Sequence, residues 1–153
     1  MEIRSATSDD AESISDVLKE LVTAMKRTKP SDPDFARHHY IDHPDQIRCS
    51  IAVDEDGTIL GFQSLKTADE GNPYGTPVGW GIIGTHVRPS AARRGVGKEL
   101  FHSTHDAARR AGIRKIEAFI GEGNGAAIAY YEAIGFRTCR TADGAVCKSF
   151  EIG

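Results

Sequence analysis

Cysteine is scarce in this chain of 153 residues, which contains only Cys49, Cys139 and Cys147. Three is an odd number, the spacings are wide, and they match no zinc-binding pattern. His38, His39 and His43 could suggest a metal site, but no pattern of Asp or Glu residues supports a specific geometry. We therefore expect reduced structural thiols and no metal.

Long hydrophobic runs are missing, and no apolar stretch approaches the length that crosses a bilayer. Residues 1–13 are polar and acidic and lack the apolar centre of a signal peptide, which predicts a cytoplasmic location with no membrane partner. An excess of one charge is missing as well, since 19 basic and 22 acidic residues give a net charge of −3. That balance predicts no nucleic-acid partner.

The chain does have the composition of a globular protein, with 39% hydrophobic and 27% charged residues. This balance argues against disorder. A length of 153 residues is enough to bury a substantial core. We expect a single domain over residues 1–153.

Apolar periodicity and turn signals predict alternating helices and strands. The clearest helix begins at a cap on Thr7 or Ser8, has basic residues at 26–29 near its end, and stops before Pro30. The other predicted elements are a strand near Ile3, a loop with a short helical piece at 31–45, strands at 47–53, 59–66, 78–87 and 115–120, helices at 96–112 and 124–134, and strands beginning at Phe136 and Ala145. This order predicts an α/β (α+β) fold with a mixed sheet and helices on both faces.

The stretch 86–100 is the most informative, because an apolar run turns into a basic loop and then into a helix whose first turn contains Gly95 and Gly97. The first N–H groups of a helix have no intrahelical partner and carry partial positive charge, and glycine lets an anion approach the backbone. Full charges come from Arg93, Arg94 and Lys98. The pattern fits a phosphate-binding site, and it also fits a glycine-marked turn into a surface helix.

A second informative segment runs from Asn124 to Phe136. Asn124 is a good helix N-cap and Gly135 a good residue just after a helix end, so helix punctuation alone explains both. Tyr131 differs, because its spacing places it with neighbouring isoleucines on the buried face, where its hydroxyl needs a partner. A buried tyrosine near a cleft has the chemistry to donate a proton to a leaving thiolate.

Together the two segments resemble signatures of the GNAT superfamily of acyl-CoA-dependent N-acetyltransferases. The pattern V-x-P followed by R-R-G-V-G at 87–97 is similar to the family's CoA pyrophosphate loop. The pattern N-x-x-A-x-x-x-Y-E-x-x-G-F at 124–136 is similar to its other signature, in the expected order and separation. The resemblance covers roughly residues 80–136, and the N-terminal half agrees only in the order of its elements.

The resemblance implies a mixed, mostly antiparallel central sheet that splits at the cofactor site, between the strand ending near Val87 and the strand after Gly112. Acetyl-CoA would be the acetyl donor, with its pantetheine arm in the split and its pyrophosphate on the first turn of the following helix. The implied contact residues are Val87, Arg93, Arg94, Gly95, Val96, Gly97, Lys98, Asn124 and Tyr131. Two positions depart from the family pattern, since Ala92 replaces a usual Gln or Arg and Arg93 replaces a usual Gly.

The same resemblance implies the chemistry. A neutral amine attacks the acetyl carbonyl directly in a ternary complex, backbone N–H groups near Val87 polarise that carbonyl, and Tyr131 protonates the departing thiolate. The strand carboxylate that some members use as a base is missing, because its place falls near Gly81. His86 has the intrinsic basicity of a general base. A histidine that faces the opposite side of the strand, or a water chain in its place, is the alternative.

We therefore expect an N-acetyltransferase that acts on a primary amine of a small molecule; homodimers are common among the proteins it resembles. Acetylation of a protein N-terminus or lysine is the close alternative. A non-catalytic acyl-CoA-binding or sensor domain is an alternative of another class. Ala92 and the missing strand carboxylate favour this last alternative, whereas the placement of Tyr131 and Asn124 favours the enzyme.

Overall fold

The computed structural model describes residues 1–25 and 30–153. Within this part of the chain the helices are α1 (Ala11–Met25), α2 (Pro33–Ala36), α3 (Val96–Arg110) and α4 (Gly125–Ala133). The strands are β1 (Glu2–Ser5), β2 (Gln46–Val53), β3 (Ile59–Thr67), β4 (Gly81–Val87), β5 (Lys115–Gly121), β6 (Arg137–Ala142) and β7 (Ala145–Glu151). The basic residues expected near the end of the first helix, at 26–29, lie outside the described residues. No described helix is both long and apolar enough to span a membrane.

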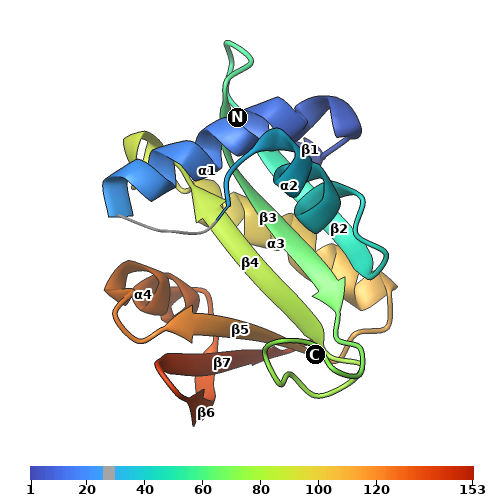
Figure 1. The fold of residues 1–153 in the computed structure, drawn as a ribbon. Helices are drawn as coiled ribbons and strands as arrows, with labels where there is room; N and C mark the ends of the chain where they lie inside the picture. Colours follow the sequence, from blue (N-terminus) through green and yellow to red (C-terminus); the bar gives the residue numbers. More distant parts are fainter. Residues whose placement is uncertain (26–29) are drawn as a thin grey trace.

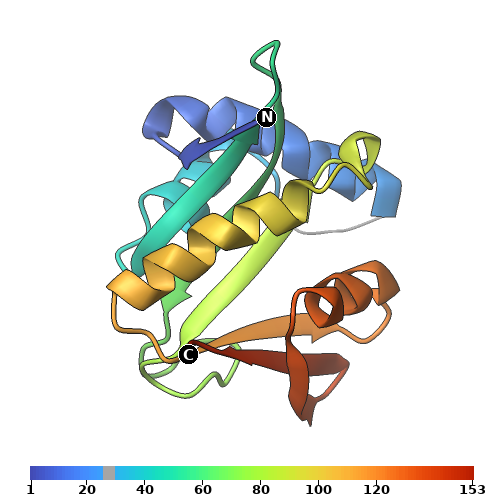
Figure 2. The same cartoon turned by 180° about the vertical axis from the view of Figure 1, so that it is seen from behind.

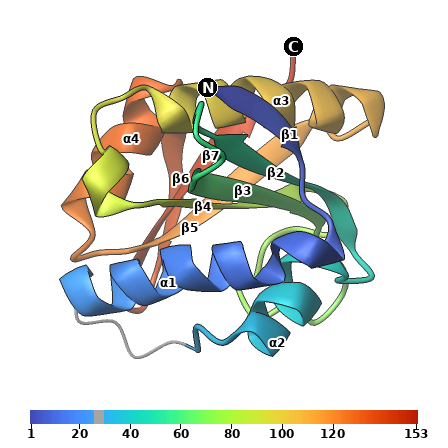
Figure 3. The same ribbon diagram turned by 90° about the horizontal axis from the view of Figure 1, so that it is seen from above.

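The described strands form one sheet in the order β1-β2-β3-β4-β5-β7-β6. Neighbouring strands are antiparallel except for β4 and β5, which are parallel. Helices α1 and α2 cover one face of this sheet, and α3 and α4 lie on the other (Figures 1 and 3). The expected mixed, mostly antiparallel sheet with helices on both faces is confirmed.

Apolar side chains fill both interfaces between helices and sheet. Ile14 and Leu18 of α1 are buried, as their spacing predicted, in one cluster with Phe62 of β3. On the other face, Phe101 of α3 and Tyr131 of α4 pack in a cluster that includes β5. Each large apolar side chain buried in this way stabilises the fold by about 1.5–3 kcal/mol.

β4 is shorter than the strand predicted at 78–87, because residues 78–80 form a turn. Gly79 has a φ of +88°, far from the extended region, and the Trp80 N–H donates to the carbonyl three residues earlier. The prediction followed a continuous run of apolar residues and glycines, which does not distinguish a strand from the turn before it. The strand therefore begins at Gly81.

β4 and β5 lie side by side at one end and diverge towards the other (Figures 1 and 2). In the described chain their parallel pairing consists of Gly81 with Ile116 and Ile82 with Glu117. β4 stays paired with β3 as far as Val87, and β5 stays paired with β7 along its whole length. The sheet therefore opens into a V between β4 and β5, as expected.

The edge of β4 that faces this V carries backbone hydrogen-bonding groups. The Arg88 N–H donates to the Leu60 carbonyl at 2.9 Å, and alternate residues of an antiparallel strand bond to the partner strand. The backbone groups of the residues between them, Thr85 and Val87, therefore point away from β3 and into the V. An extended ligand with amide groups would find hydrogen-bond partners along this edge.

A buried carboxylate holds the closed end of the V. Glu117 is 1% exposed, and its oxygens accept from Arg140 at 2.6 and 3.0 Å and from Thr76 Oγ1 at 2.8 Å. Burial acts to raise the pKa of Glu117, but the bonds from Arg140 and Thr76 outweigh it and hold the pKa below its ordinary value. Because Arg140 also donates to the Tyr74 carbonyl at 2.9 Å, the contact ties β5 to β6 and to the loop before β4.

Replacing Glu117 by Gln should lower the free energy of unfolding at neutral pH by about 1–3 kcal/mol, because Arg140 loses its charged acceptor. A lowered folded-state pKa stabilises the native state above the unfolded-state pKa, and that stabilisation is lost as the pH falls through the folded value. In urea unfolding, the difference in unfolding free energy between wild type and Glu117→Gln should therefore be smaller at about pH 3 than at about pH 6.

The matched control is Asp106→Asn, which removes a carboxylate from an exposed pair with Arg110. It should change the unfolding free energy by less than about 0.5 kcal/mol. An equal gap for Glu117→Gln at both pH values would contradict the assigned direction of the pKa.

Candidate functional site

The loop after β4 carries the start of α3 at the open end of the V. Gly95, with a φ of +76°, precedes the helix, and the first helical bond runs from the Glu99 N–H to the Gly95 carbonyl at 3.1 Å. The N–H groups of residues 95–98 come before this bond and so have no intrahelical partner. The helix start lies where the sequence predicted it, with the backbone geometry that suits an anion.

Arg93 adopts a backbone conformation that side chains rarely take, with a φ of +66°. The family that the sequence resembles usually has glycine at this position, and the structure keeps the glycine-like shape with an arginine. The cost of that shape is about 1 kcal/mol. Arg93 and Lys98 are both exposed beside the helix start.

Arg94 is directed to a different partner from the one implied for it. Its guanidinium donates to both carboxylate oxygens of Asp54, just after β2, at 3.1 and 3.2 Å. The pair is partly exposed, so it contributes at most about 1 kcal/mol, and Arg94 can exchange Asp54 for another anion at little cost. Arg94 is thus one of three basic side chains expected at the loop. The other two, Arg93 and Lys98, form no ion pair with another described residue.

Gly97 faces a tyrosine. A Cβ at Gly97 would lie 2.5 Å from Cε1 of Tyr130, closer than any real contact of this kind. The Tyr130 hydroxyl donates to the Gly97 carbonyl at 2.7 Å. The glycine predicted for close approach by an anion is thus also required for close packing of α4 against the first turn of α3.

Asn124 caps α4. Its side-chain oxygen accepts from the Ala127 N–H at 3.1 Å, which is the helix-punctuation role that the sequence allowed for it. The amide nitrogen of Asn124 is not used by this bond. The cofactor contact implied for Asn124 stays a prediction.

Tyr131 is 5% exposed, and its hydroxyl lies 2.8 Å from Thr85 Oγ1 on β4. Burial raises the pKa of Tyr131 far above its ordinary value, and hydrogen bonding to Thr85 offsets only part of this rise. Because the backbone of Thr85 faces the V, the phenol oxygen of Tyr131 lies at the edge of the V.

A buried polar chain next to Tyr131 was missed by sequence reasoning. Gln63 is fully buried, and its Nε2 donates to Thr85 Oγ1 at 2.9 Å and to the Tyr130 hydroxyl at 3.0 Å. Thr104 of α3 donates to the Gln63 side-chain oxygen. The available signal was a glutamine between Phe62 and Leu65 in a strand with a buried middle, because buried polar side chains need partners.

His86 lies on the other face of β4. Its ring stacks on Phe62 with centroids 4.6 Å apart, and it meets the edge of Tyr40 at 5.3 Å. Side chains alternate along a strand, so His86 faces α1 and α2, whereas Thr85 faces α4 and Tyr131. The structure does not bring His86 and Tyr131 together on one side of the strand.

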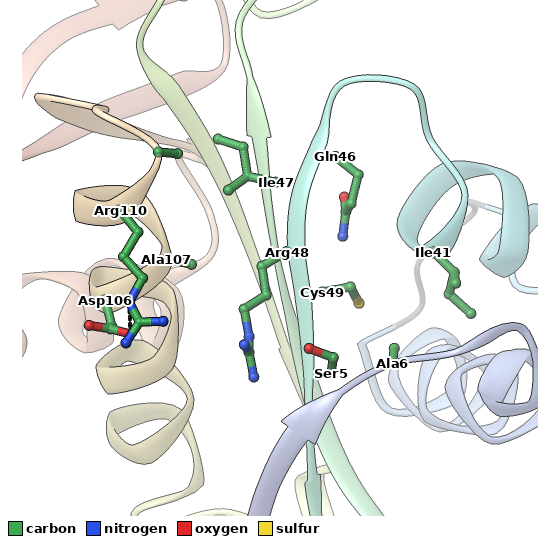
Figure 4. A pocket seen from close by; sticks show the side chains of 11 residues that line it. Ser5, Ala6, Ile41, Gln46, Ile47, Arg48, Cys49, Asp106, Ala107 and Arg110 are labelled. Atoms are coloured by element: carbon green, nitrogen blue, oxygen red, sulfur yellow. Dashed lines mark ion pairs between the residues drawn. The ribbon is translucent and has the colours of Figure 1, made fainter.

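A hollow lies away from the V, at the outer side of β2 (Figure 4). It has a volume of about 490 Å³ and lies between the start of β2 and the second half of α3. Its polar lining includes Arg48, Asp106 and Arg110, of which the last two form an ion pair. None of the residues predicted for the functional site lines this hollow.

Comparison with known proteins agrees with the fold, and the matched part of the chain includes both sequence segments. A family model described as the acetyltransferase (GNAT) family matches residues 14–136. A phosphinothricin N-acetyltransferase of Streptomyces coelicolor is 26% identical over 143 residues, which are 90% of this chain and 82% of that protein. A mycothiol acetyltransferase of Propionibacterium freudenreichii is 33% identical over 92 residues, which are 60% of this chain and 28% of that protein.

The chain therefore spans only 28% of the length of this mycothiol acetyltransferase. Among solved structures, a Salmonella typhimurium protein described as an acetyltransferase with its cofactor acetyl-CoA is similar, with a TM-score of 0.75 and 20% identity. The similarity covers 99% of this chain and 94% of that one. At this identity the likeness establishes the shared fold.

The contact between Gly97 and Tyr130 predicts an effect on stability. Gly97→Ala should lower the free energy of unfolding by about 1–3 kcal/mol, because the new methyl group displaces the Tyr130 ring. Gly125→Ala is the matched control, since it also adds a methyl group in the first turn of a helix but meets open space. Chemical denaturation of both variants measures the difference, and equal stabilities would show that the Tyr130 contact is not tight.

Proposed function

Because the chain belongs to the acetyltransferase (GNAT) family, we propose that it transfers the acetyl group of acetyl-CoA to a primary amine of a small molecule. The amine attacks directly within a ternary complex, and no covalent acetyl-enzyme forms. The observation that carries this proposal is the position of the Tyr131 hydroxyl, at the edge of β4 where the Thr85 and Val87 backbone groups point into the V.

Two features of the described residues fit acetyl-CoA. The N–H groups of residues 95–98, with the exposed side chain of Arg93, suit a pyrophosphate. The backbone groups of Thr85 and Val87 suit an extended chain that carries amides. A chain of hydrogen bonds connects the two features, because the Tyr130 hydroxyl donates to the Gly97 carbonyl and Gln63 donates to both Tyr130 and Thr85.

Tyr131 would hold the proton that the leaving sulfur requires. Burial raises the pKa of its phenol, so Tyr131 remains protonated at neutral pH. Burial acts on thiols in the same direction, so a sulfur released beside the buried phenol would be a stronger base than a thiolate in water. Such a sulfur can take a proton from the phenol.

The geometry also suits attack by the amine on the side of the acetyl carbon opposite Tyr131. His86 and Tyr131 lie across β4 from one another, so a base at His86 and an acid at Tyr131 would act on opposite sides of the reacting carbon. The Thr85 and Val87 N–H groups lie between them along the strand, where they would polarise the acetyl carbonyl. The base role of His86 stays a prediction.

A small-molecule acceptor is supported by the relatives. The Streptomyces coelicolor protein, which matches over most of both lengths, is named for a small amine-bearing acceptor. A thiol-release assay with acetyl-CoA and a panel of amines, amino acids, polyamines, aminoglycosides and peptides tests the proposal. Turnover with a small amine supports it. Turnover confined to peptides would favour protein acetylation, and acetyl-CoA binding with no turnover would favour a sensor.

Tyr131→Phe should lower kcat about 100-fold, because the leaving thiolate loses its proton donor. The KM for acetyl-CoA should change less than about threefold, since the phenol acts mainly on the departing sulfur. Tyr74→Phe is the control, because this half-buried phenol lies on the loop before β4 with its ring against Phe119. Unchanged kcat in Tyr131→Phe would rule out this residue as the acid.

Arg93→Gly should raise the dissociation constant of acetyl-CoA about fivefold, because one charge is lost while glycine keeps the loop conformation freely. Calorimetry at two salt concentrations should also show a weaker salt dependence for the variant. Arg114→Gly removes an exposed charge from a different loop and should leave the affinity unchanged. Equal affinities of wild type and Arg93→Gly would place the pyrophosphate elsewhere.

A further inference from the structure

Resting on the proposed acetyl transfer, we infer that Gln63 is a positioning residue that acts through Thr85 to keep the hydroxyl hydrogen of Tyr131 directed into the V. The inference depends on the direction of each hydrogen bond in the buried polar chain that runs from Gly97 through Tyr130, Gln63 and Thr85 to Tyr131. A chain of this kind has a fixed direction only if one end can act solely as acceptor or solely as donor.

The Gly97 carbonyl is such an end, because a carbonyl oxygen only accepts. The Tyr130 hydroxyl donates its one hydrogen to this carbonyl at 2.7 Å. The Tyr130 oxygen is then left to accept, and Gln63 Nε2 donates to it at 3.0 Å. The first turn of α3 thus determines which end of the Gln63 amide faces Tyr130.

The second hydrogen on Gln63 Nε2 is donated to Thr85 Oγ1 at 2.9 Å. On its other side, the Gln63 oxygen accepts from Thr104 Oγ1, which is consistent with the same orientation of the amide. Gln63 is fully buried, and both of its amide hydrogens and its oxygen have partners. Reversing the amide would place its oxygen against the Tyr130 oxygen, which has no hydrogen left to donate because Tyr130 gives it to the Gly97 carbonyl.

Thr85 passes the direction on to Tyr131. Since Thr85 Oγ1 accepts from Gln63, its own hydrogen is available for a phenol oxygen. Thr85 influences the pKa of both tyrosines, but the Tyr130 oxygen already accepts from Gln63. The Tyr131 oxygen lies 2.8 Å away and is the phenol oxygen still open to the Thr85 hydrogen. Tyr131 therefore accepts from Thr85, and its own hydrogen points into the V.

This direction matters for the proposed reaction. The N–C bond of the amide forms and the C–S bond of the thioester breaks, so the sulfur gains an electron pair. Tyr131 gives its proton to that sulfur, and the proton lost by the amine nitrogen returns to Tyr131 through solvent. The bond from the Thr85 hydroxyl stabilises the phenol oxygen while it is deprotonated. If Tyr131 donated to Thr85 instead, its proton would first have to turn towards the sulfur.

The test uses two variants of nearly unchanged size. Thr85→Val removes the donor to Tyr131, and Gln63→Glu replaces two N–H donors by an acceptor. Each should lower kcat about tenfold while the KM for acetyl-CoA changes less than about twofold. Thr85→Ser should restore kcat, because it keeps the hydroxyl. Ser50→Ala is the matched control, since Ser50 is a fully buried hydroxyl opposite Gln63 on β2 that bonds to Arg48 and Ser103 instead.

A spectroscopic readout makes the test independent of which amine the enzyme acetylates. In protein labelled with ¹³Cζ-tyrosine, the resonance that disappears in Tyr131→Phe reports whether the Tyr131 oxygen accepts or donates. It should shift in Thr85→Val and Gln63→Glu and stay in place in Ser50→Ala. An unshifted resonance in Gln63→Glu would overturn the inference.

The kinetic results separate the two proposals. Wild-type kcat in Thr85→Val together with a strong defect in Tyr131→Phe would overturn the role of Gln63 and leave the proposed function intact. Wild-type kcat in Tyr131→Phe would instead overturn the acid role on which this inference rests. In that case the resonance of Tyr131 still decides the direction of the hydrogen bond.

Discussion

The parallel pairing between β4 and β5 ends after Ile82 and Glu117, and the arrangement of the site depends on that early ending. Beyond this point each strand keeps its antiparallel partner on the other side, so neither is frayed. The divergence frees one edge of β4, and α4 lies near the open end with Tyr131 against Thr85. A sheet with a complete β4–β5 ladder would use the same backbone groups for its own hydrogen bonds.

Two buried polar groups flank this opening, and each is fully bonded. At the closed end Glu117 is held by Arg140 and Thr76, and near the open edge Gln63 joins Thr85 and Tyr130. An unpaired buried polar group costs about 1–3 kcal/mol, so such networks persist only when every member has a partner. The two networks therefore fix the relative positions of the strands at both ends of the V more specifically than apolar packing would.

The features predicted correctly from the sequence depend on local signals. The start of α3 is marked by Gly95, and the N-cap of α4 by Asn124, because caps and positive-φ positions are encoded within a few residues. The same local logic placed Tyr131 on a buried face. It failed at residues 78–80, where an apolar run hides a turn around Gly79.

The features that sequence reasoning missed are set by contacts between distant parts of the chain. Nothing near Gly97 in the sequence indicates that the ring of Tyr130 packs against it. Likewise, Gln63 meets Thr85 and Tyr130 only because the sheet and α4 bring three elements together. Arg94 was expected at the cofactor, and its partner on the β2–β3 turn is just as distant in sequence. Such partners follow from tertiary packing, which periodicity does not encode.

The buried cysteines mark the two sides of the V. Cys49 lies in β2 and Cys147 in β7, each on its own side of the β4–β5 divergence, and both are buried. Burial raises the pKa of both thiols, which makes them poor nucleophiles in the native state. Cys139, in contrast, is exposed on the edge strand β6. The chain thus carries a built-in chemical reporter in each half of the sheet, whose alkylation rate measures how often that half opens on its own.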